Sequence, residues 1–208
     1  MIRVLIVDDH AVVRHGLKQI MAPHPHISIV AEAESGANAL ERVRTAALDV
    51  VVLDITMENG NGIETLKQIR AEFPQLPVLI LSMHPEREYG LRSIRAGASG
   101  YLTKSSAPDE LVAAVERLAA HRKYISPELA EQLAGDYGST SAAPHERLSP
   151  REFEVFRALV AGRSVTEIAN ELSLSVKTVS THRSRLLQKL GVRNTAELMR
   201  YAAAQNLL

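Results

Sequence analysis

The sequence predicts an α/β domain with a five-stranded, doubly wound parallel sheet, followed by a small all-α domain. In the first 120 residues, short apolar runs alternate with amphipathic helical patterns. One of these runs, Val50-Val51-Val52-Leu53, is apolar without alternation, as is typical of a strand covered on both faces. From residue 148 onward, helical segments follow one another without a strand pattern. Strands that alternate with helices predict parallel pairing in the first part only.

The elements follow in a regular order. Strands are predicted at residues 3–7, 27–31, 50–53, 78–81 and 100–102, and helices near residues 11–22, 36–46, 62–72, 86–96 and 107–120. A short helix is predicted at residues 127–133. The polar, breaker-rich run of residues 135–147 is predicted to be a linker. The predicted domains are therefore residues 1–120 and 148–208, joined by a short helix and flexible linker over residues 121–147.

Composition excludes several classes of protein. The chain has no Cys, which excludes a disulfide framework and thiolate chemistry. No apolar run approaches the length of about 18 residues that a membrane span needs. The apolar start meets Asp8 and Asp9 too early for a signal peptide. We therefore expect a cytoplasmic protein with no membrane partner.

The zero net charge hides an asymmetry between the two parts of the chain. Residues 1–120 hold 12 Lys and Arg against 15 Asp and Glu, whereas residues 147–208 hold 10 against 5. A basic C-terminal segment behind an acidic N-terminal one suggests a polyanion partner for the C-terminal part. Chance scatter of surface charge is the alternative.

Polar residues follow four of the predicted strands. Asp8 and Asp9 come after the first strand, and the third, fourth and fifth are followed by Asp54, Ser82 and Lys104. Parallel strands end at one edge of a sheet, so these side chains are expected to converge there. Mg²⁺ prefers carboxylate, carbonyl and water ligands and would relieve the repulsion between the acids. The pattern predicts Asp54 as a nucleophile toward a phosphoryl group, Asp8 and Asp9 as metal acids, and Lys104 and Ser82 as phosphoryl-stabilising groups.

A phosphatase of the haloacid-dehalogenase type is an alternative with related chemistry. It also uses an aspartate after a strand, but it needs a second Asp two residues later as general acid. Thr56 occupies that position here, and the nucleophile of such enzymes normally lies on the first strand.

The C-terminal part has the sequence pattern of a helix-turn-helix. Ser149-Pro150-Arg151-Glu152 provides an N-cap, a proline at the first helical position and a capping-box glutamate. A second helix begins after Ser164, and a short turn separates it from a longer helix at residues 176–190. The residues that this longer helix is predicted to expose are Lys177, Thr178, Ser180, Thr181, His182, Ser184, Arg185 and Lys189. Short hydroxyl and basic side chains suit a DNA groove, although an ordinary polar helix face is the alternative.

The N-terminal motifs resemble the receiver domain of bacterial two-component response regulators over about residues 1–120. The motifs are Leu5-Ile6-Val7-Asp8-Asp9-His10, Leu53-Asp54-Ile55-Thr56-Met57, Leu81-Ser82-Met83 and Gly97-Ala98-Ser99-Gly100-Tyr101-Leu102-Thr103-Lys104. The resemblance implies that Asp54 accepts a phosphoryl group from a sensor histidine kinase, with no turnover of an external substrate. It also implies a paired motion of Ser82 and Tyr101, and a phosphate contact by Lys104.

The same resemblance implies the ligands of a Mg²⁺ ion. Asp9 and Asp54 match direct ligands, Asp8 matches a ligand that acts through water, and the backbone carbonyl of Thr56 matches the third protein ligand. One residue departs from the family pattern, because Glu58 stands where Pro is common. We expect this change to make the loop more flexible and to alter Mg²⁺ affinity. His84 and Thr56 lie two residues beyond Ser82 and Asp54 and are expected to tune the phosphoryl lifetime.

The C-terminal motifs resemble the LuxR-type DNA-binding domain. They are Leu148-Ser149-Pro150-Arg151-Glu152, Ile168-Ala169 and Lys177-Thr178-Val179-Ser180-Thr181-His182. Together the two resemblances imply a transcription regulator of the NarL/FixJ subfamily. Its implied recognition helix spans residues 176–190, with Lys177, Arg185 and Lys189 as phosphate contacts, and with Ser180, Thr181 and Ser184 at base edges.

Several partners follow from this resemblance. They are double-stranded DNA, RNA polymerase and a second copy of the chain, bound through the last helix (residues 195–205) and a receiver face. A phosphorylation-independent regulator and a protein-interaction pair without DNA binding are the alternatives.

Overall fold

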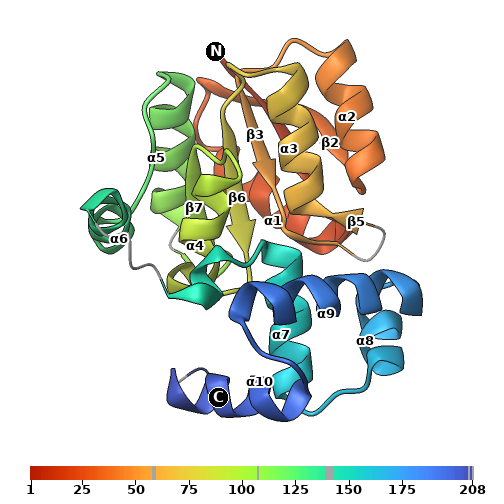
Figure 1. Cartoon of the computed structure of the whole chain (residues 1–208). Coiled ribbons are helices and arrows are strands. Elements are labelled where there is room, and N and C mark those ends of the chain that lie inside the picture. Colours follow the sequence, from red (N-terminus) through yellow and green to blue (C-terminus); the bar gives the residue numbers. More distant parts are fainter. Residues whose placement is uncertain (58–59, 107, 139–142, 206, 208) are drawn as a thin grey trace. The chain divides into compact units, whose positions relative to one another are not determined.

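The protein is described by a computed structural model, which covers residues 1–57, 60–106, 108–138, 143–205 and 207. The chain forms two compact units, Met1–Tyr137 and Gly138–Leu208. Figure 1 shows a sheet with helices on both sides in the first unit, and helices alone in the second.

The first unit contains the predicted five-stranded parallel sheet. Its strands are β1 (Ile2–Val7), β2 (Ile27–Ala33), β3 (Val50–Leu53), β6 (Val78–Ser82) and β7 (Gly100–Thr103), in the order β2-β1-β3-β6-β7. All four pairings between neighbours are parallel. The order reverses direction beside β1, which is the switch point where such sheets place their ligands. The predicted fold class is therefore confirmed.

Five helices cover the two faces of this sheet. They are α1 (Ala11–Met21), α2 (Gly36–Thr45), α3 (Gly62–Glu72), α4 (Glu86–Arg95) and α5 (Pro108–Ala119). Buried residues of α1 and α5 form one aliphatic core with alternate residues of the strands, among them Val4, Ile6, Val50, Val52, Leu79 and Leu81. Side chains of a strand point alternately to its two faces, so the intervening residues pack on the other side.

The strand register places the predicted polar residues at one edge. Val7 pairs with Leu53, and Ser82 pairs with Thr103, so the residues that follow these strands are neighbours. A small antiparallel hairpin, β4 (Thr56–Met57) and β5 (Gly60–Asn61), follows Asp54 and was not predicted. Glu58, whose effect on the loop was predicted, lies outside the described residues.

Helix α6 (Pro127–Gly138) continues five residues beyond the predicted end at residue 133. The predicted linker begins at Gly135, but glycine inside a helix costs only about 1 kcal/mol relative to alanine. Leu129 of α6 is buried, and it lies close enough to Gly90 of α4 that a Cβ on that glycine would meet its side chain. This helix therefore packs against α4.

The second unit consists of a 3-10 turn, η1 (Pro144–Arg147), and the helices α7 (Pro150–Val160), α8 (Val165–Glu171), α9 (Val176–Leu190) and α10 (Thr195–Ala204). Ser149 and Ser164 each complete a capping box, as predicted for the first of them. Ser175 and Asn194 cap the next two helices through their side chains, and Gly191 ends α9 in the left-handed conformation.

A buried glutamate joins two helices of this unit. The Glu152 carboxylate accepts hydrogen bonds from the Ser149 backbone and from Lys189 Nζ at 2.6 Å. Burial would raise the pKa of Glu152, but these two hydrogen bonds outweigh it and hold the pKa below its ordinary value. The capping carboxylate of α7 thereby also anchors the end of α9.

Among the described residues, no helix is both long enough and apolar enough to cross a membrane.

Replacing Gly62 with alanine should destabilise the first unit. A Cβ at this position would lie 2.0 Å from the Asp54 carbonyl oxygen and 2.7 Å from Ile55 Cα, so backbone must move. We expect a loss of about 2 kcal/mol or more in the free energy of unfolding, as for other overpacked sites. Gly16→Ala is the control, because nothing lies within 4 Å of its Cβ in α1 and alanine should stabilise that helix. Urea unfolding of both variants measures the difference, and equal stabilities would contradict the packing argument.

Candidate functional site

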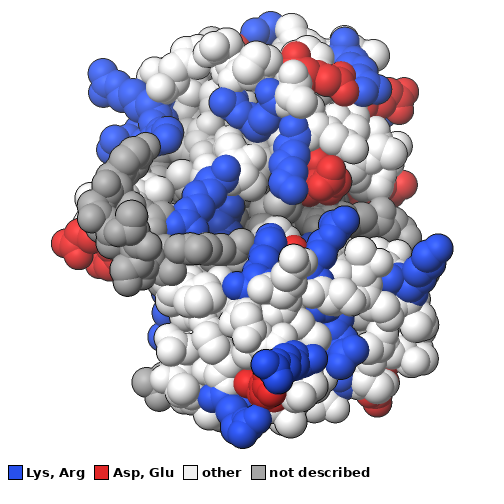
Figure 2. Space-filling model, in the orientation of Figure 1, with Lys and Arg blue, Asp and Glu red and all other residues white. Residues whose placement is uncertain are grey.

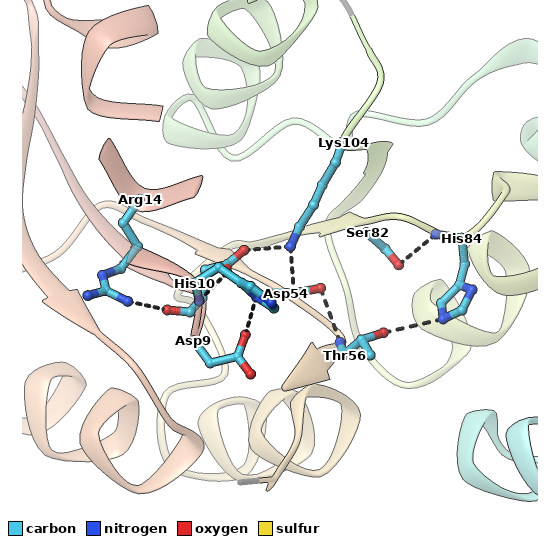
Figure 3. A network of polar contacts seen from close by, with 9 residues as sticks. Asp9, His10, Arg14, Asp54, Thr56, Ser82, His84 and Lys104 are labelled. Carbon is cyan, nitrogen blue, oxygen red and sulfur yellow. Dashed lines mark hydrogen bonds and ion pairs between the residues drawn. The ribbon is translucent and has the colours of Figure 1, made fainter. Parts of the chain in front are cut away.

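The predicted site lies at the edge of the sheet where the strands end (Figure 3). Asp54 follows β3 and is 2% exposed, and the Lys104 ammonium reaches it from the segment after β7. Lys104 Nζ lies 2.7 Å from Asp54 Oδ2 and 2.6 Å from Asp8 Oδ2. The other oxygen of Asp54 accepts a hydrogen bond of 3.1 Å from the Thr56 amide. The structure therefore brings Asp8, Asp54 and Lys104 together as predicted.

Burial and pairing act against each other on these charges. Burial raises the pKa of Asp54 above its ordinary value, and the hydrogen bond from Lys104 only partly offsets this effect. Burial would lower the pKa of Lys104, but its hydrogen bonds to Asp54 and Asp8 outweigh burial and raise the pKa. Lys104 is thus a firmly held cation. The ionised form of the Asp54 carboxylate beside it would be stabilised further by an added positive charge.

The acids beside Asp54 suit a divalent cation. Asp8, Asp9 and His10 place one ligand atom each within 4.8 Å of one another. Asp8 is 2% exposed, and His10 Nδ1 lies 2.7 Å from Asp9 Oδ1. Carboxylate oxygens at a buried edge are the ligands that a hard cation needs. The predicted carbonyl ligand belongs to Thr56, whose amide donates a hydrogen bond to the Asp54 carboxylate. The donor set therefore fits a divalent cation site.

Ser82 and Tyr101 meet at the backbone of His84. The fully buried Ser82 hydroxyl accepts a hydrogen bond of 3.1 Å from the His84 amide. The Tyr101 hydroxyl donates to the His84 carbonyl at 2.8 Å, and burial raises the pKa of Tyr101. Both members of the predicted switch pair therefore bond to the backbone of His84, and a hydrogen bond with Ser82 also acts on the Tyr101 hydroxyl.

The side chain of His84 links the site to helix α4. Its Nε2 lies 3.3 Å from Thr56 Oγ1, and its ring stacks on buried Tyr89 at a centroid distance of 4.4 Å. Thr56 and His84, predicted separately as neighbours of the phosphoryl group, thus contact each other. Their effect on its lifetime stays a prediction.

Two residues beside the acids were missed by sequence reasoning. His10 pairs with Asp9, and the Arg14 guanidinium donates to the Asp8 carbonyl at 2.8 Å (Figure 3). Arg14 lies on the first turns of α1, directly after the acidic motif. Its position in the sequence is compatible with this contact, but a long flexible side chain at that spacing reaches many other partners.

The second candidate site is the face of α9. Lys177, Ser180, Thr181, Ser184 and Arg185 are exposed, as predicted. The hydroxyls of Thr181 and Ser184 donate hydrogen bonds to backbone carbonyls one turn earlier, which holds both side chains close to the helix.

The other three predicted residues of α9 make contacts within the unit. The Thr178 hydroxyl lies 2.8 Å from the Ser175 hydroxyl at the helix cap, and Lys189 is held by Glu152. His182 is half-buried, and burial lowers its pKa. Its Nδ1 is buried and hydrogen-bonds to none of the residues that the structure describes. Lys189 is therefore exposed, as predicted, although it is paired with Glu152, whereas Thr178 and His182 are half-buried and less accessible than predicted.

Basic side chains are frequent on the molecular surface. Figure 2 shows Lys and Arg side chains spread over the face in view, with fewer acidic ones among them. Residues 147–208 alone carry a balance of +5. A polyanion would meet an attractive field at this part of the chain.

Comparison with known families assigns both parts of the chain. Residues 4–116 match the response regulator receiver domain, and residues 146–202 match the bacterial regulatory proteins of the luxR family. The chain is 39% identical to the transcriptional regulatory protein MctR of Rhizobium johnstonii over 201 residues, which cover 97% of this chain and 92% of that protein. It is 34% identical to the response regulator UvrY of Escherichia coli K12 over 209 residues, covering 100% of this chain and 96% of UvrY.

A solved structure of a relative is similar over nearly the whole chain. RcsB from Salmonella enterica serovar Typhimurium, bound to promoter rprA in the presence of the phosphomimetic BeF3⁻, is 30% identical with a TM-score of 0.66. The similarity covers 98% of this chain and 99% of RcsB. These proteins regulate transcription and are not turnover enzymes, which sets the phosphatase alternative aside. The chain belongs to the NarL/FixJ family of bacterial response regulators, in which a receiver domain precedes a LuxR-type helix-turn-helix DNA-binding domain.

Proposed function

We propose that Asp54 accepts a phosphoryl group from a sensor histidine kinase, and that the phosphorylated chain binds promoter DNA as a homodimer. The single observation that carries the proposal is the Lys104 ammonium, which touches both Asp54 and Asp8 at the end of the sheet. The working domains are residues 1–120 and 148–208, with residues 121–147 as the connection. Promoter DNA as a partner also implies a cytoplasmic location.

The transfer uses the residues of this edge. An oxygen of the Asp54 carboxylate forms a bond to phosphorus, while the bond from phosphorus to the imidazole nitrogen of the kinase breaks. Lys104 pairs with the phosphoryl oxygens, and Ser82 donates a hydrogen bond to them. Asp9, Asp54 and the Thr56 carbonyl would hold Mg²⁺, with Asp8 acting through water. When bound, this ion supplies positive charge to the phosphoryl group.

The output uses α9 as the recognition helix. Lys177, Arg185 and Lys189 contact phosphates, while Ser180, Thr181 and Ser184 lie at base edges, flanked by Thr178 and His182. Lys189 must exchange Glu152 for a phosphate to do so. Helix α10 and a receiver face form the dimer, as suits paired half-sites about one helical turn apart. RNA polymerase is the further partner.

Ser82 and Tyr101 couple the two activities. Both bond to His84 in the structure. When Ser82 turns to the phosphoryl group, the His84 amide loses its acceptor, and the segment between β6 and α4 shifts. Phosphorylation then favours the DNA-binding population of the chain.

Asp54→Asn should abolish phosphorylation. With acetyl phosphate and Mg²⁺, intact mass spectrometry of the wild-type chain should show a single phosphoryl adduct, which the variant lacks because an amide cannot act as the nucleophile. Asp49→Asn is the control, since Asp49 pairs with Arg3 outside the site and should keep the adduct. An unchanged adduct in Asp54→Asn would place the acceptor elsewhere.

His84→Ala should shorten the lifetime of the aspartyl phosphate several-fold. The imidazole contacts Thr56 at the rim of the site, and its loss lets water reach the phosphorus. Decay of the adduct after removal of acetyl phosphate measures the half-life. Met83→Ala is the matched control, because Met83 is the neighbouring residue and its side chain is 75% exposed. Equal half-lives in all three proteins would exclude this role for His84.

Lys177→Ala and Arg185→Ala should each weaken DNA binding in a salt-dependent way. The slope of log K against log salt is negative, and each lost phosphate contact should reduce its magnitude by about 1. Titration of random duplex DNA at several salt concentrations measures the slope. Arg122→Ala is the control, because Arg122 is exposed in the first unit. If the α9 variants keep the wild-type slope, this face does not bind phosphates.

A further inference from the structure

We propose that Arg14 is a positioning residue for the acids of the cation site, and that Glu32 orients it. Arg14 does not touch Asp54, and the family motifs quoted above leave it out. The inference rests on the proposed function, because it concerns the same cation site. It adds a residue that acts through the backbone and not as a ligand.

The guanidinium of Arg14 contacts both the acidic turn and strand β2, and Figure 3 shows it beside Asp9 and His10. Its Nη1 donates to the Asp8 carbonyl at 2.8 Å, and its Nε donates to Glu32 Oε2 at 3.3 Å. The side chain is 17% exposed, and a planar group with two partners at fixed angles has little freedom to turn. Glu32 therefore determines the direction in which Arg14 meets the Asp8 carbonyl.

The peptide groups on both sides of Asp8 are fixed by these contacts. The Asp8 amide donates to the Ala33 carbonyl at 3.1 Å, and the Asp8 carbonyl accepts from Arg14. The Asp8 side chain accepts from the His10 amide through Oδ1 and pairs with Lys104 through Oδ2. Arg14 holds the carbonyl of the peptide that joins Asp8 to Asp9, so it helps to set how the second acid faces the site. Residues that orient metal ligands from behind typically change affinity 10- to 100-fold when removed.

The charge of Arg14 acts in the opposite direction. A guanidinium near the acids repels a bound cation, so its removal would by itself tighten cation binding. Glu32 offsets this charge locally, and hydrogen bonds from Lys18 and Arg14 lower the pKa of Glu32 and keep it ionised. The hydrogen bond to a backbone carbonyl remains as the main effect. Positioning and repulsion therefore predict changes of opposite sign.

Mn²⁺ binding to the full chain, followed by electron paramagnetic resonance, separates the two effects. Arg14→Ala should weaken Mn²⁺ binding about tenfold. Arg14→Lys should restore part of the affinity, since an ammonium donates to the same carbonyl. Glu32→Gln should give an intermediate loss. Lys18→Ala is the matched control, because Lys18 pairs with the same Glu32 but makes no contact with Asp8 among the described residues, and it should bind as wild type does.

Phosphorylation by acetyl phosphate at increasing Mg²⁺ gives a second measurement. Arg14→Ala should need more Mg²⁺ but reach the wild-type rate at saturation, because Asp54 and Lys104 are intact. A rate that stays low at every Mg²⁺ concentration, or wild-type or tighter Mn²⁺ binding by Arg14→Ala, would overturn the inference. If Arg14→Ala does not fold, Arg14→Lys and Glu32→Gln decide, with full affinity in both as the contrary result. Absence of any adduct in the wild-type chain would instead refute the proposed function, and the Mn²⁺ affinities would still judge Arg14.

Discussion

The ion pairs of Lys104 with Asp54 and Asp8 are the constraint on which the first unit depends. Two carboxylates that are each 2% exposed lie at the end of adjacent strands, and a buried charge without a partner costs several kcal/mol. Lys104 reaches both acids because β7 pairs with β6 and ends beside them. The pair also keeps the site responsive, since any group that draws Lys104 away leaves Asp8 and Asp54 in need of another cation.

The sheet was predictable because its information is local. Short apolar runs of three to five residues, separated by amphipathic patterns, permit few other arrangements, and parallel strands then place Asp8, Asp54, Ser82 and Lys104 at one edge. The contacts of long side chains were not predictable. Arg14 and Lys189 each have several possible partners at the observed spacing, and only the packed chain selects Asp8 and Glu152. The length of α6 was missed because Gly135 weakens a helix without ending it.

The second unit separates residues that build the helix-turn-helix from residues that face outward. Arg151 donates to the Leu172 carbonyl at the end of α8, and Glu152 ties the start of α7 to Lys189. The motif around Ser149 is therefore a set of internal ties among three helices. Sequence similarity at these positions reports the architecture, whereas the exposed residues of α9 are the ones that we propose to contact DNA.

The short β-bridge between Gly100 and Tyr124 protects the chain against aggregation through the edge of its sheet. Strand β7 is the last in the sheet, and an open strand edge is a template on which another chain can add a strand. The chain after α5 returns along this edge, where the Tyr124 amide donates to the Ser99 carbonyl at 3.0 Å. A side chain at Gly100 would collide with the Tyr124 carbonyl, so the glycine keeps this cover close. The first residues of β7 are thereby covered and cannot pair with a strand of another chain. The segment that covers them leads directly into α6.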